Sequence, residues 1–146
     1  MPILDALGRS LRSLRLSVTD RCNLRCHYCM PEDHYLWLPR EDVLTFEELA
    51  QVADLLSKVG VDRVRLTGGE PLLRRDLPDL VRQLASRSWL RDLALTTNGV
   101  LLAGLAADLK RSGLHRLTVS IDTLRADRFQ RLARLDALPQ ALAGIA

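Results

Sequence analysis

The sequence predicts an α/β fold: a parallel sheet that forms a partial (βα) barrel, truncated to about four strand–helix units. Strand-like segments alternate four times with segments in which apolar residues recur at helical spacing, and the links between them are short. This alternation favours a parallel sheet with right-handed crossovers. A closed barrel typically needs about eight strands, and the last helical pattern reaches Ala146 without a terminating residue. We therefore expect residues 1–146 to form one domain and an incomplete barrel.

The strands are predicted from apolar alternation and from short runs of strand-forming residues. Leu14, Leu16 and Val18 alternate with Arg15 and Ser17, a pattern typical of a strand with one polar face. Three later segments, rich in Val, Leu, Ile and Thr, each end at a glycine or a polar residue. The predicted strands are residues 11–19, 61–67, 93–97 and 116–121.

The helices are predicted from apolar spacing and from their start and stop residues. Thr45 followed by Glu48 is the signature of a capping box, and Gly60 marks the end of that helix. Asp76 is expected to cap the second helix. The predicted helices are residues 45–59, 77–85, 101–112, 127–135 and 138–146, and residues 31–43 are expected to be irregular.

Polar or glycine-rich segments follow all four predicted strands. In parallel α/β folds, ligands bind beyond the carboxyl ends of the strands. We name this edge of the sheet the rim. The segments expected there are residues 22–29 (the cysteine loop), 68–71 (Gly-Gly-Glu-Pro), 96–99 (Thr-Thr-Asn-Gly) and 120–122 (Ser-Ile-Asp). The sequence therefore predicts a single site assembled from four strand ends.

The composition argues against a nucleic-acid or membrane partner. The chain is 47% hydrophobic and 27% charged with a net charge of +3, which is too mild to indicate a nucleic-acid partner. We find neither a signal peptide nor an apolar run long enough to span a membrane. The expected location is the cytoplasm. Cytosolic thiols stay reduced, so clustered cysteines there indicate metal binding or catalysis rather than disulfides.

All three cysteines lie in the cysteine loop, in the spacing C-x3-C-x2-C: Cys22, Cys26 and Cys29. Four thiolates normally fill an iron–sulfur cluster or a structural zinc site. Three thiolates leave one metal position open for another ligand. The alternative is a zinc site completed by His27 or His34, although zinc ligands usually come as two separated couples.

The cysteine spacing, with Tyr28 just before Cys29, resembles the signature of radical S-adenosylmethionine (SAM) enzymes. The Gly-Gly-Glu-Pro segment resembles a second motif of that superfamily. A longer ordered set of motifs resembles the GTP 3',8-cyclase family of molybdenum cofactor biosynthesis, in its N-terminal part. The segments that carry this resemblance are residues 16–23, 28–31, 64–74, 96–99 and 119–122, and the likeness extends over residues 14–146.

The resemblance implies a cofactor-driven lyase in which no protein side chain is itself catalytic. Cys22, Cys26 and Cys29 would hold a [4Fe-4S] cluster whose open iron binds SAM. Reductive cleavage of SAM would give a 5'-deoxyadenosyl radical, which takes the C3' hydrogen of GTP before closure onto C8. The product would be (8S)-3',8-cyclo-7,8-dihydroguanosine 5'-triphosphate. The partners implied are GTP, an electron donor and a second copy in a homodimer, with neither nucleic acid nor membrane.

The resemblance also assigns binding residues by position. The SAM contacts would be Tyr28, Gly69, Glu70 and Ser120, and the GTP contacts would be Arg15, Arg65 and Thr96. Other interpretations stay open: Glu70 as a loop carboxylate, and Arg15 and Arg65 as solvated strand residues. Arg74 and Arg75 are expected to be a surface or helix-start pair rather than ligands. Asn98 and Asp122 are expected either at the site or as caps of the next turn.

The chain departs from the family pattern after Cys29, because no cysteine follows it. The family places a second [4Fe-4S] cluster on three further cysteines near its C-terminus, and we expect that cluster only in a full-length protein. The chain is therefore interpreted as the SAM-binding half of the enzyme. The alternatives are another radical SAM enzyme with a different substrate, and an inactive metal-binding fragment.

Overall fold

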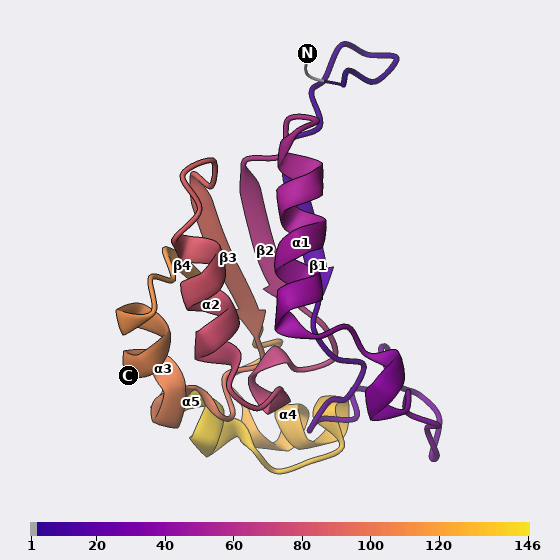
Figure 1. Ribbon diagram of the computed structural model, residues 1–146. Coiled ribbons are helices and arrows are strands. Elements are labelled where there is room, and N and C mark those ends of the chain that lie inside the picture. The colour runs from indigo at the N-terminus through magenta and orange to yellow at the C-terminus, as the bar shows by residue number, and fades with distance from the viewer. Residues whose placement is uncertain (1–2) are drawn as a thin grey trace.

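The computed structural model describes residues 3–146 and contains a four-stranded sheet in the order β1-β2-β3-β4, with every neighbouring pair parallel. The strands are β1 (Ser13–Ser17), β2 (Arg63–Thr67), β3 (Asp92–Thr97) and β4 (Arg116–Val119). All four predicted strands are confirmed, three of them as shorter elements inside the expected ranges. Because the strands are parallel and in sequence order, their carboxyl ends meet at one edge, as expected for the rim (Figure 1).

The helices also lie close to their predicted ranges. They are α1 (Phe46–Ser57), α2 (Leu77–Ala85), α3 (Leu102–Arg111), α4 (Ala126–Ala133) and α5 (Leu138–Ile145), with short 3-10 turns η1 (Arg40–Asp42) and η2 (Pro71–Leu73). Figure 1 shows α4 crossing beyond the carboxyl ends of the strands, while α1 and α2 run alongside the sheet. Within residues 3–146, no helix is both long enough and apolar enough to cross a membrane.

The main core lies between the sheet and the first three helices. Its fully buried residues include Leu66 and Leu95 from the sheet and Leu80, Leu84 and Leu109 from the helices. Side chains alternate between the two faces of a strand. One face of the sheet is therefore aliphatic, which accounts for the alternation seen in the sequence.

Two helix starts that were predicted from capping residues differ in their chemistry. At α1, the Thr45 hydroxyl accepts from the Glu48 N–H, and the Glu48 carboxylate accepts from the Thr45 N–H, so the capping box is confirmed. At α2, Asp76 occupies the N-cap position but makes no capping hydrogen bond. Its φ of 57° is left-handed, whereas a capping side chain needs an extended backbone to reach the first turn. The position of the cap was right and its mechanism was wrong.

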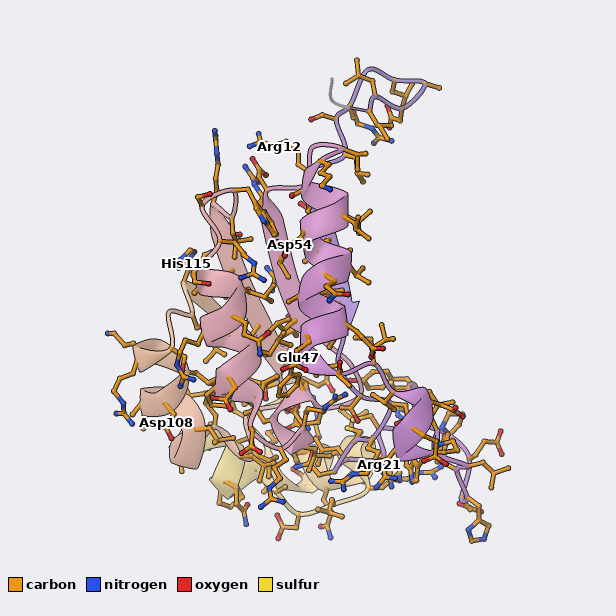
Figure 2. All side chains as sticks on the ribbon, viewed as in Figure 1. Arg12, Arg21, Glu47, Asp54, Asp108 and His115 are labelled. Carbon is orange, nitrogen blue, oxygen red and sulfur yellow. The ribbon has the colours of Figure 1, made fainter. Side chains whose placement is uncertain are left out.

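The second face of the sheet is polar, and we name it the open face. Parallel sheets are usually covered on both faces, but here one row across the sheet consists of Arg15, Arg65, Ala94 and Arg116. A cavity of about 210 Å³ lies along this row. Figure 2 shows the two ends of the sheet, with Arg12 at the amino end and Arg21 at the rim.

Candidate functional site

The cysteine loop begins where β1 ends, and main-chain hydrogen bonds fasten its start to the Gly-Gly-Glu-Pro segment. The N–H of Gly69 donates to the Thr19 carbonyl at 2.8 Å (N to O), and the N–H of Glu70 donates to the Arg21 carbonyl at the same distance. A Cβ atom at Gly69 would lie 2.2 Å from the Arg21 carbonyl oxygen. The absence of a side chain at Gly69 is therefore needed for the approach of the chain that leads into Cys22.

Inside the loop, a tight turn and one arginine fix the path of the chain. The N–H groups of Cys29 and Met30 both donate to the Cys26 carbonyl, at 2.9 and 2.7 Å (N to O). Arg25 Nη1 donates to the Cys22 carbonyl at 2.6 Å, and its guanidinium lies 5.2 Å from the centre of the Trp37 ring. This role of Arg25 was not predicted from the sequence.

Helix α4 supports the loop from the other side. The N–H groups of Arg25 and His27 donate to the carbonyls of Ala133 and Leu132, each at 3.0 Å (N to O), at the end of α4. A second apolar cluster packs there, and Cys22 and Cys26 border it; its buried members are Leu24, Phe129, Ala133, Ala137 and Leu138. The helix was predicted, but its docking on the cysteine loop was not. The signal in the sequence was the apolar pair Phe129 and Ala133, four residues apart on one helix face.

The three thiols differ in exposure. Cys22 and Cys26 are partly buried and Cys29 is exposed. Burial raises the pKa of the Cys22 and Cys26 thiols, and the charge of nearby acidic groups raises both further. Among residues 3–146, no three His, Cys, Asp or Glu side chains are arranged to hold a metal ion. The donor set of three soft sulfur ligands in one ordered loop nevertheless fits an iron–sulfur cluster, whose binding must displace the thiol protons.

Glu70 is one of the most buried polar residues, with 1% of its surface exposed. Its Oε1 accepts from the Leu72 N–H at 3.0 Å and from the Thr97 hydroxyl at 2.6 Å, and its Oε2 accepts from the Asn98 N–H at 2.7 Å. This carboxylate therefore joins the end of β2 to the end of β3. Of the two interpretations of Glu70, a loop carboxylate or a SAM contact, its hydrogen bonds support the loop carboxylate, which holds two strand ends together.

Tyr28 and Asp122 join the cysteine loop to the end of β4. The Tyr28 hydroxyl donates to Asp122 Oδ2 at 2.6 Å (O to O), and this bond, followed by burial, raises the pKa of Tyr28 well above its ordinary value. Ser120 is exposed, and its N–H donates to the Thr97 carbonyl at 2.8 Å. The structure thus brings Tyr28, Gly69, Glu70 and Ser120 to one rim.

The three residues assigned to GTP lie on the open face, next to this rim. Arg65 Nη1 donates to the hydroxyl oxygens of Thr96 and Thr118, at 3.0 Å each. Arg15 pairs in register with Arg65 on the neighbouring strand and is exposed. Thr118 was not predicted from the sequence; it faces the same side as Thr96 because the two are register partners.

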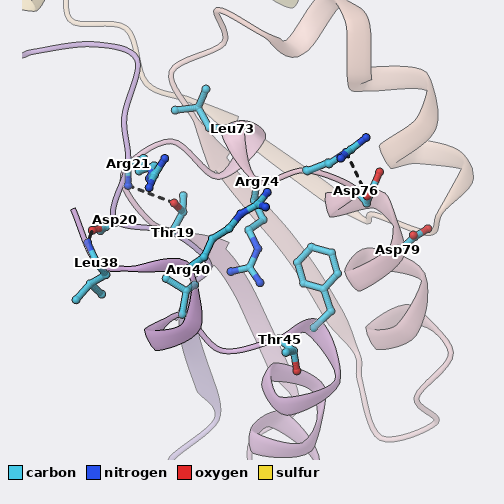
Figure 3. Close-up of a pocket in the computed structure, with 13 residues that line it drawn as sticks. Thr19, Asp20, Arg21, Leu38, Arg40, Thr45, Leu73, Arg74, Asp76 and Asp79 are labelled. Atoms are coloured by element: carbon cyan, nitrogen blue, oxygen red, sulfur yellow. Dashed lines mark hydrogen bonds and ion pairs between the residues drawn. The ribbon is translucent and has the colours of Figure 1, made fainter.

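A second cavity, of about 530 Å³, lies beside the start of the cysteine loop (Figure 3). Arg74 lines it and donates to the carbonyls of Val18 and Leu44, at 2.7 Å each (N to O). Burial and the charge of Arg40 lower the pKa of Arg74. Arg75 instead forms an exposed ion pair with Asp76. Arg74 thus ties the segment before α2 to the ends of other elements, whereas Arg75 makes the ion pair with Asp76 at the start of α2.

These features define the class of the protein as an α/β partial barrel whose site lies at the carboxyl edge of a parallel sheet, with three thiols in its first loop. The chain belongs to the Radical SAM superfamily, whose family model matches residues 16–145. The cofactors that this family implies are a [4Fe-4S] cluster and S-adenosylmethionine.

Curated relatives carry the comparison further. The chain is 52% identical over 145 residues to GTP 3',8-cyclase 1 of Mycobacterium tuberculosis, covering 97% of this chain and 40% of that protein. It is 56% identical over 149 residues to GTP 3',8-cyclase of Acidothermus cellulolyticus, covering 99% of this chain and 41% of that protein. The chain thus spans about two fifths of the length of these relatives.

Solved structures support the fold alone. Methylornithine synthase (PylB) matches with a TM-score of 0.69 at 17% identity, over 91% of this chain and 40% of that one. Streptococcus suis SuiB bound to S-adenosylmethionine matches with a TM-score of 0.66 at 18% identity, over 86% of this chain and 27% of that one. Both likenesses agree with the partial barrel predicted from the sequence.

Proposed function

We propose that this chain is the SAM-binding part of a GTP 3',8-cyclase, the enzyme that converts GTP to (8S)-3',8-cyclo-7,8-dihydroguanosine 5'-triphosphate in molybdenum cofactor biosynthesis. The observation that carries this proposal is the position of the cysteine loop. Its start is hydrogen-bonded to the end of β2 and its Asn23 to the end of β3, and it lies beside an open face that bears Arg15, Arg65 and Arg116. Identity above 50% to two cyclases over nearly the whole chain supports the choice of substrate.

In this proposal Cys22, Cys26 and Cys29 hold the [4Fe-4S] cluster. When bound, the reduced cluster supplies the electron that cleaves SAM to methionine and a 5'-deoxyadenosyl radical. The protein's own task is to keep the three thiols in one loop. The turn at the Cys26 carbonyl, the Arg25 contacts and the hydrogen bonds to α4 serve that task. The chemistry belongs to the cofactors, and the chain supplies position and exclusion of water.

The proposed SAM contacts lie around the cysteine loop. Tyr28 and Ser120 have exposed side chains at the rim, and Gly69 is exposed at its backbone. Glu70 already accepts three hydrogen bonds from its own chain, so it has about one of four lone-pair positions left for a ligand amino group. We infer that Glu70 acts chiefly by holding the rim together, with Tyr28, Gly69 and Ser120 nearer the ligand.

The proposed GTP contacts are the arginines of the open face. Guanidinium groups match the geometry of phosphate oxygens and keep their charge. The two threonine hydroxyls that accept from Arg65 hold its side chain flat along the sheet. Thr96 then serves both as a contact and as an orienting group. In the longer relatives the remaining contacts, including a second cluster, would come from the part that this chain does not span.

The proposed partners are GTP and an electron donor that reduces the cluster, and the proposed location is the cytoplasm. A homodimer is also proposed on the family resemblance alone. The cytoplasmic location is supported by composition and by thiols that must stay reduced.

The test has two parts. The chain is purified anaerobically, reconstituted with iron and sulfide, reduced with dithionite in the presence of SAM, and assayed for 5'-deoxyadenosine. Formation of 5'-deoxyadenosine is expected even without GTP, as slow uncoupled cleavage. A chain that holds a cluster and forms none would contradict the SAM-binding role.

The second part measures GTP affinity by calorimetry for the unmodified chain, for Arg65→Ala and for Arg111→Ala. Arg111 is an exposed arginine on α3 that pairs with Asp108, so it is a matched control. A charge-assisted bond is worth about 1.5–3 kcal/mol, and a loss of tenfold or more in affinity is expected for Arg65→Ala only. Equal GTP affinity in all three proteins would contradict a GTP site on the open face.

A further inference from the structure

Asn98 lies in the Thr-Thr-Asn-Gly segment, where the sequence left its role open, and the structure connects it directly to the cysteine loop. Its side-chain Nδ2 donates to Asn23 Oδ1 at 2.8 Å and lies 4.0 Å from the Sγ atom of Cys22. The two amide protons of Nδ2 can serve these two acceptors at once. Asn98 therefore contacts a predicted metal ligand and the residue that follows it.

The orientation of the Asn98 amide is fixed by its own surroundings. Its Oδ1 accepts from the Val100 N–H at 3.0 Å, so the oxygen end of the amide must face the chain that follows. The nitrogen end then has to point toward the cysteine loop. Because a main-chain N–H can only donate, this contact excludes the flipped amide.

The backbone of Asn98 is held as firmly as its side chain. Its N–H donates to Oε2 of the buried Glu70 at 2.7 Å. The next residue, Gly99, has a φ of 82°, and a Cβ there would lie 2.8 Å from a Val119 methyl group. The turn after β3 therefore has little freedom, and a partly buried Asn98 presents its amide to Cys22 in a preset position.

Two N–H groups thus surround the Cys22 sulfur. The main-chain N–H of Leu24 points to Sγ from within the loop, at 3.5 Å (N to S), and the Asn98 amide approaches from the end of β3. Hydrogen bonds to the ligand sulfurs are among the factors that set the reduction potential of an iron–sulfur cluster. An N–H donor stabilises the more negative, reduced state and so raises that potential.

We propose that Asn98 is a positioning residue for the cluster: it orients Cys22 through Asn23 and donates an N–H···S hydrogen bond that makes the bound cluster easier to reduce. This inference rests on the proposed cluster site. It assigns the Asn of the Thr-Thr-Asn-Gly segment a role distinct from SAM or GTP binding. Groups of this kind orient metal ligands and tune the metal that they hold.

The test separates the sulfur contact from the turn. Asn98→Ser keeps a short side-chain oxygen that can accept from the Val100 N–H, but it cannot reach Cys22. Asn98→Ala loses both contacts. Gln83→Ala is the control, because it removes a partly buried amide on α2 whose hydrogen-bond partner is Glu47 on α1 and not a cysteine. Each reconstituted chain is titrated with reductant and monitored by electron paramagnetic resonance, and iron retention is measured against a chelator.

The expected result is a reduction potential more negative than that of the unmodified chain in both Asn98 variants and unchanged in Gln83→Ala. About a tenfold lower chelator concentration should remove half of the iron from the Asn98 variants. An unchanged potential and iron retention in Asn98→Ser would overturn the inference, and an effect in Asn98→Ala alone would assign the residue to the turn. If the unmodified chain takes up no iron, the cluster proposal itself fails, which is a different outcome from failure at Asn98.

Discussion

Glu70 offers a quantitative test of how the rim is held together. The variant Glu70→Gln keeps the size and shape of the side chain but replaces one carboxylate oxygen with an NH2 group. In the structure, Oε1 accepts two hydrogen bonds and Oε2 accepts one, all from the protein. The NH2 group would best take the Oε2 position, where it would meet the Asn98 N–H and leave two donors facing each other.

The magnitude follows from these contacts. A buried donor without an acceptor costs about 1–3 kcal/mol, and the two remaining hydrogen bonds lose the strength that a charged acceptor gives them. Glutamine also avoids the cost of burying a charge, which works in the opposite direction. With Glu70 only 1% exposed, we expect a net loss of about 2 kcal/mol in the free energy of unfolding.

The assay is urea unfolding of the iron-free chain, followed by far-ultraviolet circular dichroism under reducing conditions. Glu48→Gln is the matched control, because Glu48 is exposed and glutamine also forms a capping box. The control should stay within about 0.5 kcal/mol of the unmodified chain. If Glu70→Gln is no less stable than Glu48→Gln, the buried carboxylate does not hold the rim together.

Three further variants, with Gly104→Ala as a control, test the loop, its support and the amino end of the sheet. Gly69→Ala places a Cβ 2.2 Å from the Arg21 carbonyl oxygen and should lower both the urea midpoint of unfolding and the iron uptake. The control Gly104→Ala has open space around its Cβ in a helix and should raise the free energy of unfolding by about 0.5–1 kcal/mol. A Gly69→Ala chain more stable than Gly104→Ala would refute the close approach. Phe129→Ala should cost about 3 kcal/mol and reduce the iron bound per chain, and unchanged iron would show that α4 does not support the cysteine loop. The hydrogen bond from Arg12 lowers the pKa of Asp62, so the contribution of this pair to folding stability is present above a pH of about 4 and is lost as the pH falls further. In Asp62→Asn the melting temperature should therefore fall less steeply below that pH than in the unmodified chain.

Local patterns in the sequence were enough to place the strands, the helices and the four segments of the rim. Apolar alternation at Leu14 and Leu16 and the pair Thr45 and Glu48 act over a few residues, so they can be read without the fold. Asp76 shows the limit of that reading. Its residue type suits a cap, but its left-handed backbone is set by how η2 and α2 are joined.

The parts of the site that were missed are contacts between distant segments. Glu70 was named from the sequence, but its buried bridge to β3 could not be predicted, because that bridge depends on the end of β3 approaching the end of β2. The support of the cysteine loop by α4 uses main-chain groups of Arg25 and Ala133, and main-chain donors and acceptors carry no residue-specific signal. Arg25 was overlooked although its partners are close in sequence, because it binds the main-chain carbonyls of Cys22 and Leu24, which carry no residue-specific signal.

The metal content of the cysteine loop tests the cluster site most directly. The chain is reconstituted anaerobically with iron and sulfide in the presence of competing zinc, and bound iron, sulfide and zinc are measured for the unmodified chain, Cys26→Ala and His27→Ala. We expect about four iron atoms and four sulfides per chain, retained in His27→Ala and lost in Cys26→Ala. Zinc without iron, or an iron content that Cys26→Ala leaves unchanged, would contradict a cluster held by Cys22, Cys26 and Cys29.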